Sequence, residues 1–212
     1  MKNAKECLIP LHAGYQELKT FQIAQLVFDV TVRFCDLYVD RKSRTRDQMT
    51  QAARSGVQNI AEGSVASGTS KKMELKLTNV ARASLEELRL DYEDFLRQRE
   101  LPQFQPDHPA LRRFKALRCA SMAQFKAWVA EEMRRTRSNT DPHGPTRGKG
   151  GSVSVRAGPC QSVLVANAAL SLLNLAIFLL KRQIEAQASA FEAEGGFTER
   201  LYKVRKARSF CS

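Results

Sequence analysis

Apolar side chains recur at helical spacing along the first 133 residues, and no stretch of this region alternates apolar and polar residues as a β-strand would. Between Tyr15 and Val39 there is no glycine or proline, and the polar residues form one narrow stripe. The rest of this predicted helix is apolar. Such a helix is covered on more than one side, either inside a bundle or between a bundle and a second copy of the chain.

Three more helices are predicted in this region, from Arg46 to Glu62, from Lys71 to Arg99 and from Pro109 to about Met133. The first of them contains Gly56, which indicates close approach of a neighbouring helix, because glycine costs about 1 kcal/mol relative to alanine in a helix. Four helical patterns joined by short loops predict an all-α fold, an antiparallel four-helix bundle over residues 14–133.

The remainder of the chain is predicted to form two further parts. Residues 134–162 hold five glycines, three prolines and six basic residues against one acidic residue, which is typical of a flexible basic linker. Residues 163–212 are predicted to be a C-terminal helical extension with a basic tail.

The predicted extension begins with an uncharged apolar run, Val163 to Leu180, at the lower length limit for crossing a bilayer. Asn167, Ser171 and Asn174 place a polar stripe along it. This stripe favours a buried or oligomer-forming helix over a membrane span, and both interpretations stay open.

The sequence contains no recognisable catalytic or metal-binding set. Its five cysteines form no CxxC pair, and residues 1–14 lack the apolar stretch of a secretory signal, so we expect reduced thiols in a cytoplasm. His12, His108 and His143 lie in predicted loops or termini, away from any nucleophile or metal pattern. The acidic run around Glu87 and Asp91 is interpreted as a solvated helix face with neighbouring arginines. We therefore expect no enzymatic activity, no metal and no cofactor.

The formal charge of +12 is concentrated in the second half of the chain. Residues 1–100 hold 16 basic and 14 acidic side chains, whereas residues 101–212 hold 18 and 8. Basic side chains neutralise phosphates and release counterions, so RNA or DNA is the expected partner, although these charges could also serve solubility alone. The candidate nucleic-acid-binding residues are Arg112, Arg113, Lys115, Arg118, Arg134, Arg135, Arg137, Arg147, Lys149, Arg200, Lys203, Arg205, Lys206 and Arg208.

Two segments carry a family resemblance. The segment QAARSGVQNIAEG at Gln51–Gly63 and the helix at Lys76–Leu101 resemble the bacterial four-helix-bundle proteins encoded by intervening sequences of 23S ribosomal RNA genes. Related bundles include the accessory variability determinant of diversity-generating retroelements. The C-terminal part of the chain resembles members of this family that carry an extension, or suffix, after the fourth helix. The resemblance implies a non-enzymatic homo-oligomer, such as a pentamer, that binds nucleic acid and a reverse transcriptase. The alternative is a scaffold that docks a reverse transcriptase or a ribosomal component without binding nucleic acid directly.

Overall fold

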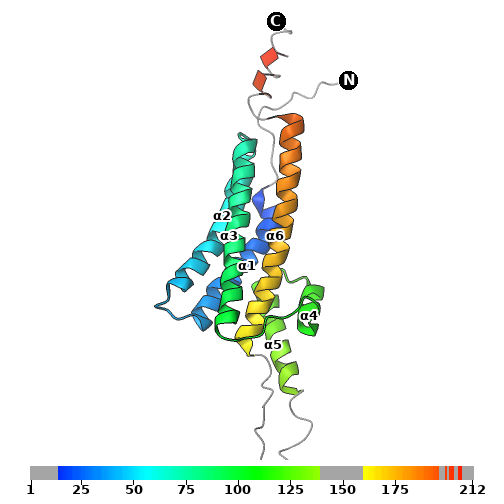
Figure 1. Ribbon diagram of the computed structural model, residues 1–212. Helices are drawn as coiled ribbons and strands as arrows, with labels where there is room; N and C mark the ends of the chain where they lie inside the picture. The colour runs from blue at the N-terminus through cyan, green and yellow to red at the C-terminus, as the bar shows by residue number, and fades with distance from the viewer. Residues whose placement is uncertain (1–13, 139–159, 196–198, 200, 203–204, 207–212) are drawn as a thin grey trace, which may run out of the picture.

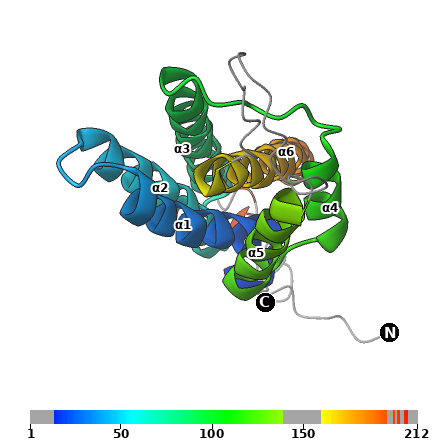
Figure 2. The ribbon, with the colours of Figure 1, turned by 90° about the horizontal axis from the view of Figure 1, so that it is seen from below.

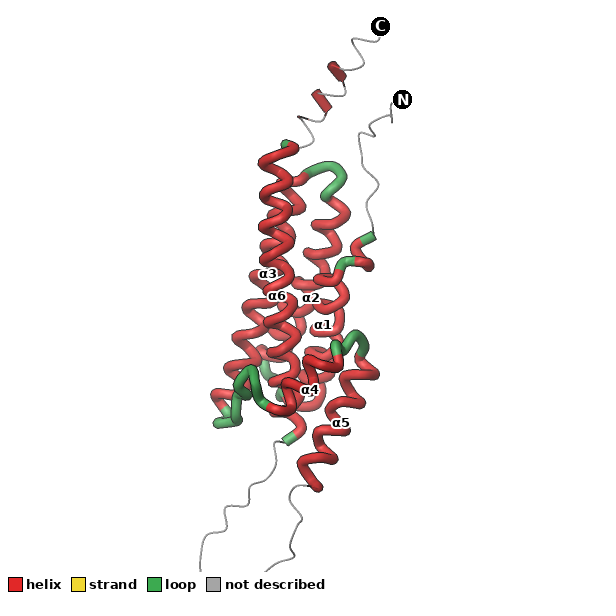
Figure 3. Tube along the Cα trace, turned by 90° about the vertical axis from the view of Figure 1, so that its right-hand side faces the viewer, coloured by secondary structure: helices red, strands yellow, loops and turns green. Residues whose placement is uncertain are grey.

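The computed structural model describes residues 14–138, 160–195, 199, 201–202 and 205–206. This part of the chain is helical and contains no strand (Figures 1 and 3). The all-α prediction is therefore confirmed for it. A short 3-10 helix at Tyr15–Glu17 precedes six α-helices: α1 Lys19–Tyr38, α2 Arg44–Ala66, α3 Lys71–Gln98, α4 Pro109–Leu117, α5 Met122–Ser138 and α6 Gln161–Glu194.

The four long helices pack into a bundle. Helix α1 contacts α2 and α6, and α3 contacts the same two helices from the other side. Successive members of this ring run in opposite directions along the molecule (Figure 1). Seen end-on, α6 lies beside both α1 and α3, while α4 and α5 lie outside the ring (Figure 2). The helices of the bundle and α5 contribute to one continuous hydrophobic core.

The prediction of one helix from Pro109 to Met133 is wrong. Arg118 adopts a left-handed conformation, with φ 47° and ψ 49°, and ends α4. Ser121 then begins α5, because its Oγ accepts the Gln124 amide N–H at 3.3 Å while the Gln124 side chain accepts the Ala120 N–H at 2.8 Å. This pair is a capping arrangement that the sequence analysis missed. Helix α5 also continues to Ser138, into the segment predicted as linker.

The fourth helix of the bundle is α6, which the sequence analysis assigned to an extension. It is long and apolar enough to cross a membrane, and two-thirds of its most apolar window is buried inside the protein. Asn167 is buried rather than part of an exposed stripe: its Oδ1 accepts the Phe104 N–H at 2.6 Å, and its Nδ2 donates to Pro102 O at 3.0 Å. Asn174 is exposed. The polar residues of α6 therefore have separate roles, and the domain boundaries at 133 and 162 stay predictions.

Most of the wide apolar surface of α1 is covered within one chain, although Leu37 is 54% exposed. The ring of Phe34 is fully buried and lies 4.8 Å from that of Tyr92 and 4.7 Å from that of Phe95. The Tyr92 hydroxyl donates to Thr31 Oγ1 at 3.1 Å, and Thr31 donates to the Val27 carbonyl at 2.7 Å. The apolar surface of α1 therefore gives no separate argument for self-association.

Close approach of α2 and α3 at Gly56 is confirmed. A Cβ atom added at Gly56 would lie 2.5 Å from Cδ2 and 2.8 Å from Cγ of Leu85, whose side chain is fully buried. Leu85 has no free space into which to move without disturbing its neighbours. Glycine is thus required here by packing, despite its low helix propensity.

Substitution Gly56→Ala should destabilise the protein by about 1 kcal/mol, since overpacking costs about 1–3 kcal/mol and better helix propensity returns about 1. Urea unfolding followed by circular dichroism measures this. In a Leu85→Ala background the clash is absent, so there the same substitution should be neutral or stabilising. An equal loss in both backgrounds would contradict the packing explanation.

In the acidic run of α3, Glu86, Glu93 and Asp94 pair with arginines, as the sequence predicts, whereas Glu87 and Asp91 do not within the described part of the chain. The ion pairs are Arg82–Glu86 at 3.9 Å, Arg89–Glu86 at 3.0 Å, Arg89–Glu93 at 2.8 Å and Arg97–Asp94 at 2.7 Å. Glu87 is exposed, whereas Asp91 has its Oδ2 buried without a hydrogen-bond partner among the described residues. Burial, then the charges of Glu87 and Asp94, raise the pKa of Asp91 to about 6.

A raised carboxyl pKa makes the folded state take up a proton that the unfolded state releases. The contribution of Asp91 to stability should therefore fall as the pH rises from about 4 to about 6. Substitution Asp91→Asn should flatten that dependence and stabilise the protein at pH 7 by about 1 kcal/mol, a figure reduced because the side chain is only half-buried. Urea unfolding across this pH range tests it, with Asp29→Asn on the exposed face of α1 as the control.

Candidate nucleic-acid interface

Helices α4 and α5 form a hairpin that is attached to the bundle beside α1 and α6 (Figure 2). Within the hairpin, the ring centroid of Phe114 lies 4.7 Å from that of Trp128 and 5.8 Å from that of Phe125, and all three side chains are buried. Residues 109–138 contain eight basic and only two acidic side chains. The hairpin therefore combines its own apolar contacts with a net charge of +6, from eight basic less two acidic residues.

Both acidic residues of the hairpin form ion pairs within it. Glu132 is 4% exposed, and its two oxygens accept hydrogen bonds of 2.6 Å from Nε and Nη2 of Arg113. These hydrogen bonds raise the pKa of Arg113. Glu131 pairs with Arg134 and, at 2.9 Å, with Arg135. Arg113 thus fixes α4 to α5, and the hairpin has no carboxylate left for its other cations.

The structure brings only part of the predicted binding set together. Arg112, Lys115 and Arg118 are exposed on and just after α4 without a carboxylate partner among the described residues, and Lys115 donates to the Pro106 carbonyl at 2.8 Å. Arg205 and Lys206 are also exposed, but in the sequence they are distant from α4. The side chain of Arg137 and the residues Arg147, Lys149, Arg200, Lys203 and Arg208 lie outside the described part.

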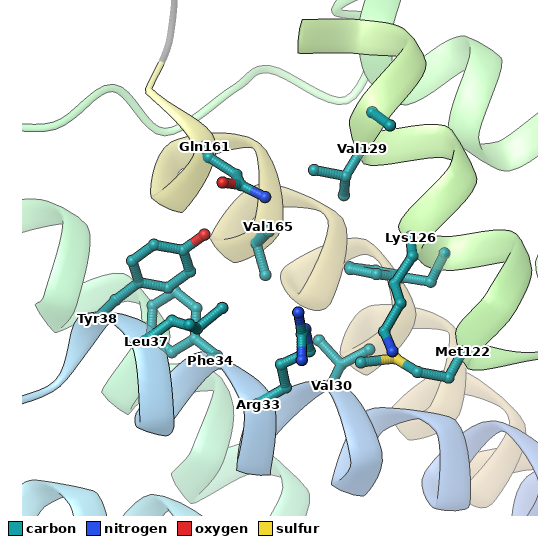
Figure 4. Close-up of a pocket in the computed structure, with 12 residues that line it drawn as sticks. Val30, Arg33, Phe34, Leu37, Tyr38, Met122, Lys126, Val129, Gln161 and Val165 are labelled. Carbon is teal, nitrogen blue, oxygen red and sulfur yellow. The ribbon is translucent and has the colours of Figure 1, made fainter.

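A cleft of about 200 Å³ lies between α1, α5 and the start of α6 (Figure 4). Its walls are mainly apolar, with Val30, Leu37, Met122, Val129 and Val165. Arg33 of α1 and Lys126 of α5 also line it, and no acidic residue does. Neither cation has a carboxylate partner among the residues that the structure describes. The cleft is therefore apolar in its walls and positively charged.

Two further polar groups face the cleft. The amide of Gln161 points into it from the first turn of α6, roughly opposite Arg33 (Figure 4). The hydroxyl of Tyr38 is buried and has no hydrogen-bond partner in the described structure. Burial raises the pKa of Tyr38, while the nearby Arg33 acts in the opposite direction. The cleft thus also offers neutral hydrogen-bonding groups.

Sequence reasoning missed Arg33 and Lys126 because they are 93 positions apart, on elements whose packing no periodicity reveals. One signal was present: Arg33 is the only cation on the polar stripe of the first predicted helix, so it has no basic neighbour there. A solitary cation on such a stripe is by itself ordinary.

Among the described residues there is no group of three or more His, Cys, Asp or Glu side chains that could hold a metal ion. No family model matches the chain, and neither a curated protein nor a solved structure was found to be similar to it. The family resemblance therefore stays a prediction. The structure places Gln51–Gly63 in α2 and most of Lys76–Leu101 in α3, and these two helices pack directly against each other.

Substitution Arg113→Met should destabilise the protein by about 2 kcal/mol, because Glu132 would keep its charge in a buried site without a partner. We expect less than for a fully buried pair, since the Arg113 side chain is 41% exposed. Arg112→Met, on the exposed side of the same helix, is the matched control. Equal stability of both variants in urea unfolding would show that the ion pair does not hold the hairpin together.

Proposed function

We propose that this chain is a non-enzymatic nucleic-acid-binding protein, in which a helical bundle carries the α4–α5 hairpin as its contact surface. The observation that carries the proposal is the distribution of charge in the hairpin: both carboxylates are engaged in internal ion pairs. Arg112, Lys115, Arg118 and Lys126 then stand without a carboxylate partner in the described structure. A surface with unneutralised cations attracts the phosphate backbone.

Backbone contact is the expected mode of binding. Only 8% of the residues are aromatic, so stacking platforms for many successive bases are few. Contacts to phosphates position a protein on nucleic acid with little sequence preference. The basic residues outside the described part would add to the same interaction. The protein would therefore act as an accessory factor, in the cytoplasm, without specificity for a base sequence through the hairpin.

A second candidate function is a protein-interaction scaffold, and the outer face of α3 favours it. Met73 and Val80 lie on one side of this helix and Leu90 lies about a quarter of a turn around it, and the three side chains are 45%, 38% and 55% exposed. They offer a surface for a second copy or for a partner such as a reverse transcriptase or a ribosomal component. Light scattering at micromolar concentration should then give a mass above 23.8 kDa. A monomeric mass would contradict self-association but would leave nucleic-acid binding untouched.

Charge reversal of the hairpin should weaken binding strongly. The variant Arg112→Glu/Lys115→Glu/Arg118→Glu should lower the affinity for RNA or DNA by about 100-fold at 50 mM salt and should reduce the slope of log K against log salt, because roughly three phosphate contacts are removed. Fluorescence anisotropy with labelled single-stranded and duplex oligonucleotides measures both quantities.

The matched control reverses three exposed cations of the bundle, Arg54→Glu/Lys72→Glu/Lys181→Glu, which changes the net charge by the same amount. If affinity depended on net charge alone, the two triple variants would show the same loss of affinity for RNA or DNA. Absence of binding by the unmodified protein at low salt would refute the proposed function. Co-purification of a protein partner that survives nuclease treatment, without nucleic-acid binding, would support the scaffold instead.

A further inference from the structure

The cleft between α1, α5 and the start of α6 differs in chemistry from the α4 surface. It brings together two cations, an amide, a hydroxyl and apolar walls, from three elements that are distant in sequence. Figure 4 shows the Arg33 guanidinium pointing into it from α1 and the Lys126 chain descending from α5 towards α1. Neither cation forms an ion pair among the described residues, so an anion placed between them would gain attraction from both.

The polar groups of the cleft discriminate between classes of anionic ligand. A fatty acid would use the two cations and the apolar walls, but its single carboxylate is its only polar group, and it has no second group for the Gln161 amide and the Tyr38 hydroxyl once the cations hold that carboxylate. A nucleotide presents a phosphate, a flat apolar face and a hydrogen-bonding edge together. The buried hydroxyl of Tyr38, which lacks a partner among the described residues, would gain one from such an edge.

We propose that the cleft accepts one unstacked nucleotide of a single strand, with its phosphate between Arg33 and Lys126 and its base against Leu37 and Tyr38. Leu37 is 54% exposed, so this wall is accessible without rearrangement of the core. The Gln161 amide, which can both donate and accept, faces the edge of the base. This inference rests on the proposed function, to which it adds a preference for single strands over duplex.

The preference follows from geometry. A base in a duplex is stacked and paired, and moving it into a cleft requires that both interactions be broken. A base of a single strand is already available, and its contact with an aromatic or apolar side chain adds affinity without much dependence on its identity. The α4 surface, by contrast, contacts phosphates that both forms present.

Filling the cleft tests this without altering charge. Ala130 lines the cleft from α5 and is exposed, so Ala130→Trp should occupy it. Ala127→Trp, one turn earlier at an exposed position that does not line the cleft, is the matched control. In anisotropy titrations with labelled oligothymidylate of about 12 nucleotides, Ala130→Trp should weaken binding about 10-fold, and Ala127→Trp less than 2-fold. Binding of a duplex of the same length should change less than 2-fold in both variants.

Photo-crosslinking of the unmodified protein gives a second readout that does not depend on the folding of a variant. Oligonucleotides carrying 5-iodouracil should crosslink to the peptide that contains Leu37 and Tyr38, and Arg33→Gln/Lys126→Gln should abolish that adduct. Crosslinks confined to α4, with Ala130→Trp binding as the unmodified protein does, would overturn the inference and leave the proposed function intact. If the unmodified protein binds neither single strand nor duplex, both this inference and the proposed function are refuted.

Discussion

The packing of α6 between α1 and α3 is the interaction on which the rest of the structure depends. Its apolar run buries Leu164, Leu173 and Leu180 completely, and each such side chain contributes about 1.5–3 kcal/mol through removal from water. Without α6, helices α1, α2 and α3 would expose one side of their shared core. Because the α4–α5 hairpin stands between α3 and α6 in the chain, the return of α6 also determines where the hairpin is held, and Asn167 secures the loop that leads to it.

Local sequence signals predicted much of this fold. The observed bounds of α2 and α3, Arg44–Ala66 and Lys71–Gln98, differ by at most a few residues from those expected, because periodicity and caps act within a helix. The break at Arg118 was missed because a left-handed residue at a helix end is usually glycine. The role of α6 was missed for another reason: an apolar run shows that a helix is buried, but not which helices bury it.

The candidate site was predicted less completely, for the same reason. The sequence shows where cations are numerous, but it does not show which are neutralised. Arg113 and Glu132 are 19 positions apart, and their bidentate pair exists only because α4 and α5 fold against each other. Arg33, by contrast, stood outside the basic half of the chain and lies in a cleft with Lys126 through tertiary packing. Tertiary contacts therefore remove Arg113 from the list of unpaired candidate cations and add Arg33 and Lys126 to it.

The contrast between α3 and the hairpin shows why the location of charge matters more than its total. On α3, each of Arg82, Arg89 and Arg97 has an acidic neighbour three or four positions away, so this surface is nearly neutral over one helical turn. In the hairpin there are two carboxylates for eight basic side chains, and both are already paired, so Arg112, Lys115, Arg118 and Lys126 have no carboxylate partner among the described residues. A phosphate approaching α3 meets as much repulsion as attraction, whereas one approaching α4 meets mainly attraction. The bundle and the hairpin thus divide the molecule into an electrostatically balanced scaffold and a cationic surface.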